Sequence, residues 1–126
     1  KDLVDLDILC NKIGEVSAEQ EQLFKQRNNV KANDIVVYFV RQTIPPLAGC
    51  AAHPIGRPGC VIVQTASEWV LSHEVGHVLG LNHTPDGLAN GSDRLMFPVD
   101  AFTNPPPDLV PAEIKQMDQS DLTVDC

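Results

Sequence analysis

Three of the four histidines in this chain lie in one short segment, HEVGHVLGLNH, at positions 73–83. His73 and His77 are four residues apart, so on a helix their side chains lie on the same face, one above the other. Gly80 can end such a helix in the left-handed conformation without strain, which lets the chain turn and bring His83 back toward the first two. A fold that uses this segment must therefore bring three imidazole rings to one point.

Three imidazoles form a typical ligand set for a zinc ion, with metal–nitrogen distances of about 2.0–2.1 Å and a fourth position left open for water. His73, His77 and His83 are therefore the predicted metal ligands. Glu74 is too near His73 to bind the same ion with it, but it is well placed to act as a general base toward that water. Unconnected surface histidines are the simpler alternative, and a structural zinc would need a fourth protein ligand.

The N-terminal part of the chain is expected to be helical. Apolar residues between positions 3 and 24 recur with near-helical spacing, which predicts one or two amphipathic pieces that end near Asn29. The spacing is interrupted at Gly14, and the sequence SAEQ at positions 17–20 fits a capping box that restarts the helix.

Two runs rich in β-branched residues predict strands, the first from Asp34 to Thr43 and the second at positions 60–65. A capping box formed by Thr65 and Glu68 is expected to start the helix that carries the histidines. A short final helix is predicted near residues 112–119. The chain of 126 residues has no internal linker and is expected to be one domain, 1–126.

The four cysteines are Cys10, Cys50, Cys60 and Cys126, and none forms a C-x-x-C pair. Cys50 and Cys60 enclose a short loop, whereas Cys10 and Cys126 lie near the termini, which are often close in space. Of the three connectivities that four cysteines allow, we expect Cys50–Cys60 with Cys10–Cys126. Such disulfides predict an extracellular, secreted protein or another oxidising compartment; four reduced thiols are the alternative.

The histidine segment resembles the metzincin signature H-E-x-x-H-x-x-G-x-x-H, and RLMFP at positions 94–98 resembles the Met-turn of that family of zinc peptidases. This resemblance implies that Gly80 is the turn glycine and that Met96 supports the site from beneath the metal. The stretch GCAAHP at positions 49–54 is similar to the edge strand of matrixins, whereas Thr84 after the third histidine is more like pappalysin-type enzymes.

The family implies an α+β, zincin-like fold: a small, twisted, mainly antiparallel sheet with an N-terminal helix, an active-site helix and a C-terminal helix. It also implies that an extended peptide pairs with an edge strand, expected at Gly49 to His53, and that residues 97–102 wall the pocket after the scissile bond. The candidate substrate-binding residues are Gly49, Cys50, Ala51, Ala52, His53, Phe97, Pro98, Val99 and Phe102.

A second cofactor is suggested by the loop at positions 86–93. Asp86, Asn90, Ser92 and Asp93 place four oxygen-bearing side chains within eight residues, and oxygen ligands of this kind can hold Ca²⁺. The spacing is not that of an EF-hand, and loops of this composition are more often solvated turns.

The expected function is that of a monomeric zinc-dependent endopeptidase acting on a peptide or protein substrate. The net charge of −8 argues against a nucleic-acid partner, and no apolar run approaches the ~20 residues of a membrane span. The alternatives are a non-catalytic secreted binding module that zinc stabilises, against which Glu74 counts, and a zinc hydrolase of non-peptide amides. The same activated water would serve that last reaction, so it stays open.

Overall fold

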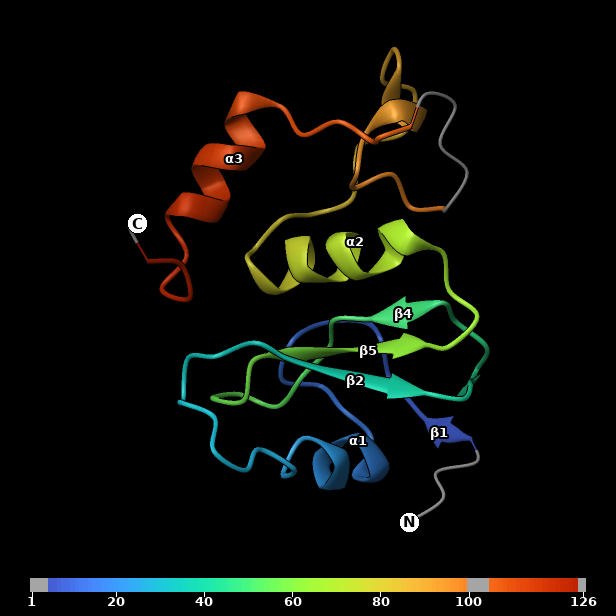
Figure 1. Cartoon of the computed structure of the whole chain (residues 1–126). Helices are drawn as coiled ribbons and strands as arrows, with labels where there is room; N and C mark the ends of the chain where they lie inside the picture. Colours follow the sequence, from blue (N-terminus) through green and yellow to red (C-terminus); the bar gives the residue numbers. More distant parts are fainter. Residues whose placement is uncertain (1–4, 100–104, 125–126) are drawn as a thin grey trace.

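The structure, a computed structural model, describes residues 5–99 and 105–124 and places a sheet between two helices (Figure 1). In chain order the elements are β1 (Leu6–Asp7), α1 (Ala18–Leu23), β2 (Val36–Val40), β3 (Thr43–Ile44), β4 (Gly49–Cys50), β5 (Gly59–Val63), α2 (Glu68–Val78), the 3-10 helix η1 (Gly91–Asp93) and α3 (Pro111–Asp118). Helices α1 and α2 lie on opposite faces of the sheet, and the C-terminal segment with α3 lies on the far side of α2. The architecture is therefore a small mixed α+β fold.

The main sheet has the strand order β2-β5-β4, so β5 is central and β4 lies at an edge. β2 and β5 run parallel, with Val36 opposite Gly59, whereas β4 and β5 run antiparallel, with Cys50 opposite Val61. A separate small sheet pairs β1 with β3 in parallel. The prediction of a mainly antiparallel sheet is wrong, because the long connection through β3 and β4 lets the chain re-enter beside β2 in the same direction.

All five residues of β5 are buried, and the four after Gly59 divide between two apolar clusters. Val61 and Val63 pack on the α1 side, in a cluster that includes Phe24. Cys60 and Ile62 pack on the α2 side, in a cluster with Val70, Val78 and Ala51. Since successive side chains of a strand point to opposite faces, one strand anchors both layers and fixes where α2 lies.

The N-terminal residues are only partly helical, which corrects the expectation for this region. Leu6 and its neighbours form β1, with Leu6 N–H donating to the Gln42 carbonyl at 3.1 Å and Ile8 N–H to the Ile44 carbonyl at 3.0 Å. Pairing with β3 thus overrides the helical spacing of the apolar residues. The capping box is confirmed: the Gln20 N–H donates to Ser17 Oγ at 3.0 Å, and the Ser17 N–H donates to Gln20 Oε1 at 2.9 Å.

The Gln20 side chain also connects the N-terminal segment to the chain that follows β4. It is fully buried, and its Nε2 donates to the carbonyls of Leu9 at 3.2 Å and Ala52 at 3.3 Å. A further bond joins the Gly14 N–H to the His53 carbonyl at 2.9 Å. These bonds place residues 9–14 beside the chain that follows β4.

Helix α2 begins one residue after Ser67, whose side chain makes no capping bond, so the expected capping box of Thr65 and Glu68 is wrong. Gly80 follows the helix with a φ of +99°, the conformation expected for a glycine that ends a helix. The strands at 36–40 and 59–63 and the helix α3 confirm the sequence predictions to within a few residues. Among the described residues, no helix has the length and apolar character that spanning a membrane requires.

The disulfide joins Cys10 to Cys50, with their α-carbons 5.8 Å apart, and Cys60 is a buried free thiol. Both predicted pairs are therefore wrong, although Cys126 itself lies outside the described residues. The β4–β5 register explains why Cys50 and Cys60 do not pair. Cys50 lies opposite Val61, and Cys60 is the neighbour of Val61 in β5, so the Cys60 side chain points to the other face of the sheet. Cys10 reaches Cys50 because residues 9–14 lie beside it.

We expect peptide mapping without reduction to recover Cys10 linked to Cys50. Burial raises the pKa of the Cys60 thiol to about 12, so Cys60 should resist alkylation in the folded protein and react fully after unfolding in denaturant. Recovery of a peptide that links Cys50 to Cys60, or rapid alkylation of Cys60 under native conditions, would contradict this arrangement.

Candidate metal centre

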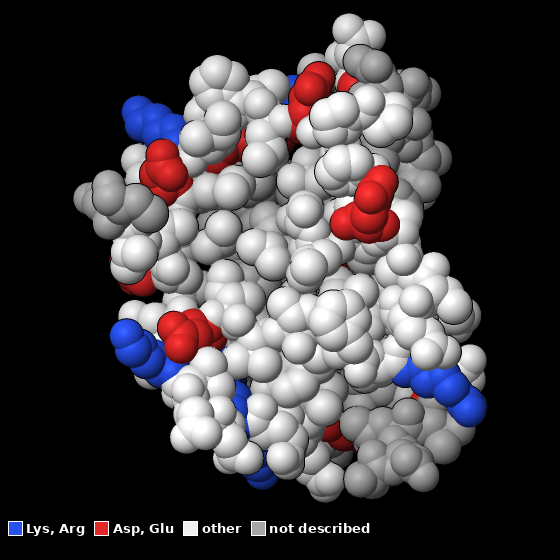
Figure 2. Space-filling view, viewed as in Figure 1, with Lys and Arg blue, Asp and Glu red and all other residues white. Residues whose placement is uncertain are grey.

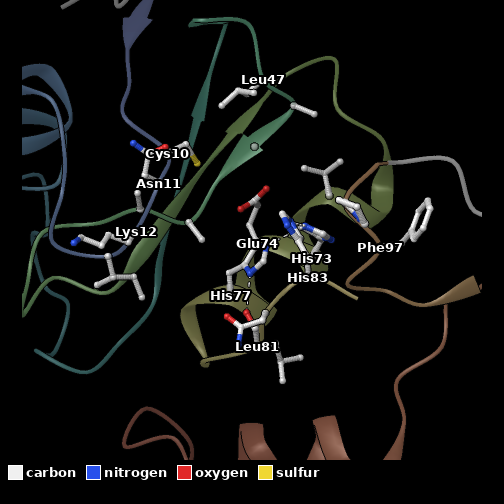
Figure 3. A pocket seen from close by; sticks show the side chains of 18 of the residues that line it. Cys10, Asn11, Lys12, Leu47, His73, Glu74, His77, Leu81, His83 and Phe97 are labelled. Carbon is white, nitrogen blue, oxygen red and sulfur yellow. Dashed lines mark hydrogen bonds between the residues drawn. The ribbon is translucent and has the colours of Figure 1, made fainter. Parts of the chain in front are cut away.

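The three histidines converge as their spacing predicts. His73 and His77 project from α2, and His83 approaches from the segment beyond Gly80 (Figure 3). The Nε2 atom of His73 lies 3.1 Å from that of His77 and 3.3 Å from that of His83. Ligand atoms on the three residues all lie within 4.8 Å of one another, so this group could hold a metal ion.

The spacing of the nitrogens fits a tetrahedral ion. Metal–nitrogen bonds of about 2.0–2.1 Å that meet at tetrahedral angles place the two nitrogens about 3.3 Å apart. The observed separations of 3.1 and 3.3 Å agree with that geometry. The side chains therefore need little rearrangement to bind an ion.

Backbone carbonyls set the tautomers of the two helical histidines. The Nδ1 of His73 lies 2.7 Å from the Leu95 carbonyl oxygen, and the Nδ1 of His77 lies 2.8 Å from the Leu81 carbonyl oxygen. A carbonyl only accepts hydrogen bonds, so each Nδ1 carries the proton and each Nε2 keeps its lone pair. Hydrogen bonds of this kind orient metal-binding histidines and increase their basicity toward the ion.

The surroundings of His77 keep its ring in the neutral form that can bind a metal ion. Burial lowers the pKa of His77 to about 4, and the neighbouring His73 and His83 act in the same direction against the Leu81 hydrogen bond. The imidazole of His77 is therefore neutral near pH 7 and can act as a ligand. Two nitrogen lone pairs 3.1 Å apart repel each other, and a cation between them removes that repulsion.

Glu74 projects from α2 into the space between the histidines and β4 (Figure 3). Its side chain is largely buried, and burial raises the pKa of the carboxyl group to about 7, opposed by a hydrogen bond from the Ala51 N–H. A carboxyl group that protonates near neutral pH can both accept and return a proton, which the predicted general base requires. The catalytic role of Glu74 stays a prediction.

Met96 is fully buried against the helix that carries His73 and His77. A β-carbon on Gly76 would lie 2.6 Å from the Met96 Sδ, so the thioether occupies the space that a larger helical residue would need. Met96 lies in a turn that is closed by the Phe97 N–H, which donates to the Arg94 carbonyl at 3.0 Å. The carbonyl of Met96 accepts the Thr84 N–H at 2.8 Å. These contacts connect the turn to the residue that follows His83.

A cleft of about 700 Å³ opens beside the histidines. Several predicted residues line it together with Glu74 and the histidines: Gly49, Ala51, Ala52, Gly80, Phe97, Pro98 and Val99. Cys50 and His53 do not line it, because Cys50 is buried in the disulfide and His53 is buried with its Nδ1 bonded to the Pro54 carbonyl. The edge strand is also shorter than predicted, Gly49–Cys50, and Phe102 lies outside the described residues.

The structure adds residues that the sequence pattern did not reveal. Residues 10–13 line the cleft from the N-terminal segment, and Leu47 and Trp69 line it elsewhere. Their positions follow from the β1–β3 pairing, from the Gln20 hydrogen bonds and from the disulfide, which have no local signature. The carbonyls of Leu81 and Leu95 were also missed, although both residues lie close in sequence to predicted site residues.

The calcium prediction gains no support from the structure. In the described parts of the chain, the histidine group is the one place where three or more His, Cys, Asp or Glu side chains could share an ion. The carboxylates of the loop at positions 86–93 do not form such a group.

The space-filling view shows Lys and Arg side chains lying singly near the margin of one face, with acidic side chains among them (Figure 2).

A scan against protein-family models, a search of curated proteins and a search of solved structures found no match to this chain. The chemistry of the centre is therefore inferred from its own geometry and from the residues that form it.

We predict that the chain binds one divalent metal ion at this centre. His77→Ala removes a central ligand and should abolish stoichiometric binding, measured by elemental analysis after dialysis. His53→Gln is the matched control, because His53 lies outside the group and should keep one ion per chain. Stoichiometric metal in the His77 variant would contradict this ligand set.

Gly76→Ala should lower the stability of the protein, although alanine normally favours a helix over glycine by about 1 kcal/mol. The added methyl group meets the buried Met96 Sδ, and overpacking of this kind costs about 1–3 kcal/mol. Chemical unfolding should show a net loss of stability. Ser72→Ala, at an exposed position of the same helix, is the control and should leave the free energy of unfolding unchanged or raise it. If Gly76→Ala unfolded at a higher denaturant concentration than the parent, the Met96 side chain would have to move aside freely, against this prediction.

Proposed function

We propose that this chain is a zinc-dependent endopeptidase of the metzincin type, which cleaves peptides or proteins in an oxidising, extracellular compartment. The observation that carries the proposal is the convergence of three Nε2 atoms beside a buried carboxylate, within an open cleft. The signature in the sequence supports the same assignment, and the Cys10–Cys50 disulfide fits an oxidising compartment.

Zinc is the ion that this donor set fits best. Neutral imidazoles suit zinc among several transition metals, and three of them with an open fourth position are typical of catalytic zinc sites. The Glu74 carboxylate lies against Gly49 and accepts from the Ala51 N–H, and it is not one of the group of residues that could share the ion. A closed structural site would instead use a fourth protein ligand.

When bound, zinc supplies a water of lowered pKa and polarises the scissile carbonyl. Glu74 accepts the proton of the attacking water on its carboxylate and later donates it to the nitrogen of the leaving amine. The carbonyls of Leu95 and Leu81 keep the rings of His73 and His77 in the orientation that binding requires.

The edge of the sheet offers a place for an extended peptide. The Val63 N–H donates to the Ala48 carbonyl at 3.0 Å, so the alternating pattern of the strand directs the backbone groups of Gly49 away from β5. A peptide aligned there lies beside Glu74 and the histidines. Trp69, Val70 and Val99 provide an apolar lining, which favours a hydrophobic side chain next to the scissile bond.

Glu74→Gln should leave the fold and the bound zinc intact and lower kcat by about 10²–10⁴-fold, because it removes the base and no ligand. Hydrolysis of a denatured protein substrate, with and without a chelator, measures this loss. Glu68→Gln, in the first turn of the same helix, is the matched control and should retain full activity.

The same assay separates the alternatives. A non-catalytic binding module would hydrolyse nothing in either state, and a hydrolase of non-peptide amides would cleave small amides while leaving denatured protein uncut. Activity of the Glu74 variant within tenfold of the parent would remove Glu74 from the mechanism.

A further inference from the structure

We propose that the edge strand β4 and the residue that follows it position the Glu74 carboxylate, with Gly49 providing the space that it occupies and the Ala51 N–H fixing its direction. The inference rests on the proposed function, because it concerns the base of that reaction. It makes Gly49 a positioning residue that acts through Glu74, in addition to any contact with substrate.

The packing of Glu74 on Gly49 is too close for any other residue. A β-carbon at position 49 would lie 2.7 Å from Glu74 Cγ, 2.8 Å from Glu74 Oε1 and 2.8 Å from Val70 Cγ1. Ordinary contacts between such atoms are about 3.5–4.0 Å. Gly49 does not have a left-handed φ, so close approach and not backbone conformation is what requires glycine here.

The second contact comes from Ala51, the residue that follows β4. The N–H of Ala51 donates to the Glu74 carboxylate, and Ala51 packs in the apolar cluster between the sheet and α2. Gly49 and Ala51 are two residues apart, so both present the same face toward the helix. The carboxylate is thus held at its side by a bare α-carbon and at its oxygen by an amide.

The strand itself is well anchored, which gives the carboxylate a fixed reference. Gly49 and Cys50 pair with Ile62 and Val61 of the central strand, and Cys50 is joined by the disulfide to Cys10. A glutamate side chain has three rotatable bonds, and an exposed one samples many positions. Fixing it matters because a displacement of about 1 Å in a catalytic group can cost about 10²-fold in rate.

The test is Gly49→Ala in the chain of 126 residues, loaded with zinc. The added methyl group should displace the Glu74 side chain, because a side chain moves more easily than the backbone of the strand. We expect kcat to fall by about 10²-fold while the zinc content stays unchanged. The carboxyl signal of Glu74, observed with carbon-13-labelled glutamate and assigned by its loss in Glu74→Gln, should shift.

Gly91→Ala is the matched control. Gly91 is also buried, and a β-carbon there would make ordinary contacts of 3.5 Å with Leu88 and Thr84, so kcat and the Glu74 signal should not change. If Gly49→Ala folds poorly, Gly49→Ala combined with Val70→Ala relieves the contact with Val70 and keeps the one with Glu74. It is then compared with Val70→Ala alone.

An unchanged Glu74 signal in the Gly49 variant would overturn the proposal, and so would a loss of kcat that merely follows a loss of zinc. If the parent protein cleaves no peptide, the proposed function fails, but the Glu74 signal still decides the positioning. A shift in Gly49→Ala and none in Gly91→Ala supports it in that case too.

Discussion

The burial of β5 between α1 and α2 is the constraint on which the rest of the structure depends. Its side chains alternate between two apolar clusters, so one strand determines the position of the helix that carries His73, Glu74 and His77. The same strand pairs with β4 and sets the register of Gly49. The two halves of the cleft, helix and edge strand, are thereby held at a fixed spacing by a single element that supplies none of the three histidines.

The candidate metal centre combines local and distant contributions. The i, i+4 spacing of His73 and His77 is a property of the helix, but the carbonyls that orient their rings belong to the segments after α2. Leu95 is adjacent to Met96, so the turn that fills the space beneath Gly76 also supplies a hydrogen bond to a ligand. Packing and ligand orientation are therefore coupled, and disturbing the turn should be felt in both.

The sequence predicted what depends on short-range patterns: the helix 68–78, the convergence of the histidines, the glycine at position 80, the Ser17 capping box and the two principal strands. It failed where distant segments meet. The parallel β2–β5 pairing and the β1 strand depend on tertiary contacts that compete with local spacing. The sheet register keeps Cys50 and Cys60 on opposite faces, and Cys10 bonds to Cys50 because residues 9–14 lie beside it. The steric roles of Gly49 and Gly76 likewise depend on neighbours from other elements.

The disulfide has a topological consequence for a protein proposed to cut other chains. The cysteines that it joins are 40 residues apart, so the segment between them, with α1, β2 and β3, is a covalently closed ring. A single cut by a neighbouring molecule within that ring leaves both products attached through Cys10 and Cys50, with β4 still joined to the N-terminal segment. The exposed connections between α1 and β2 lie inside the ring. The disulfide thus keeps the wall of the cleft attached after a single cut within the ring.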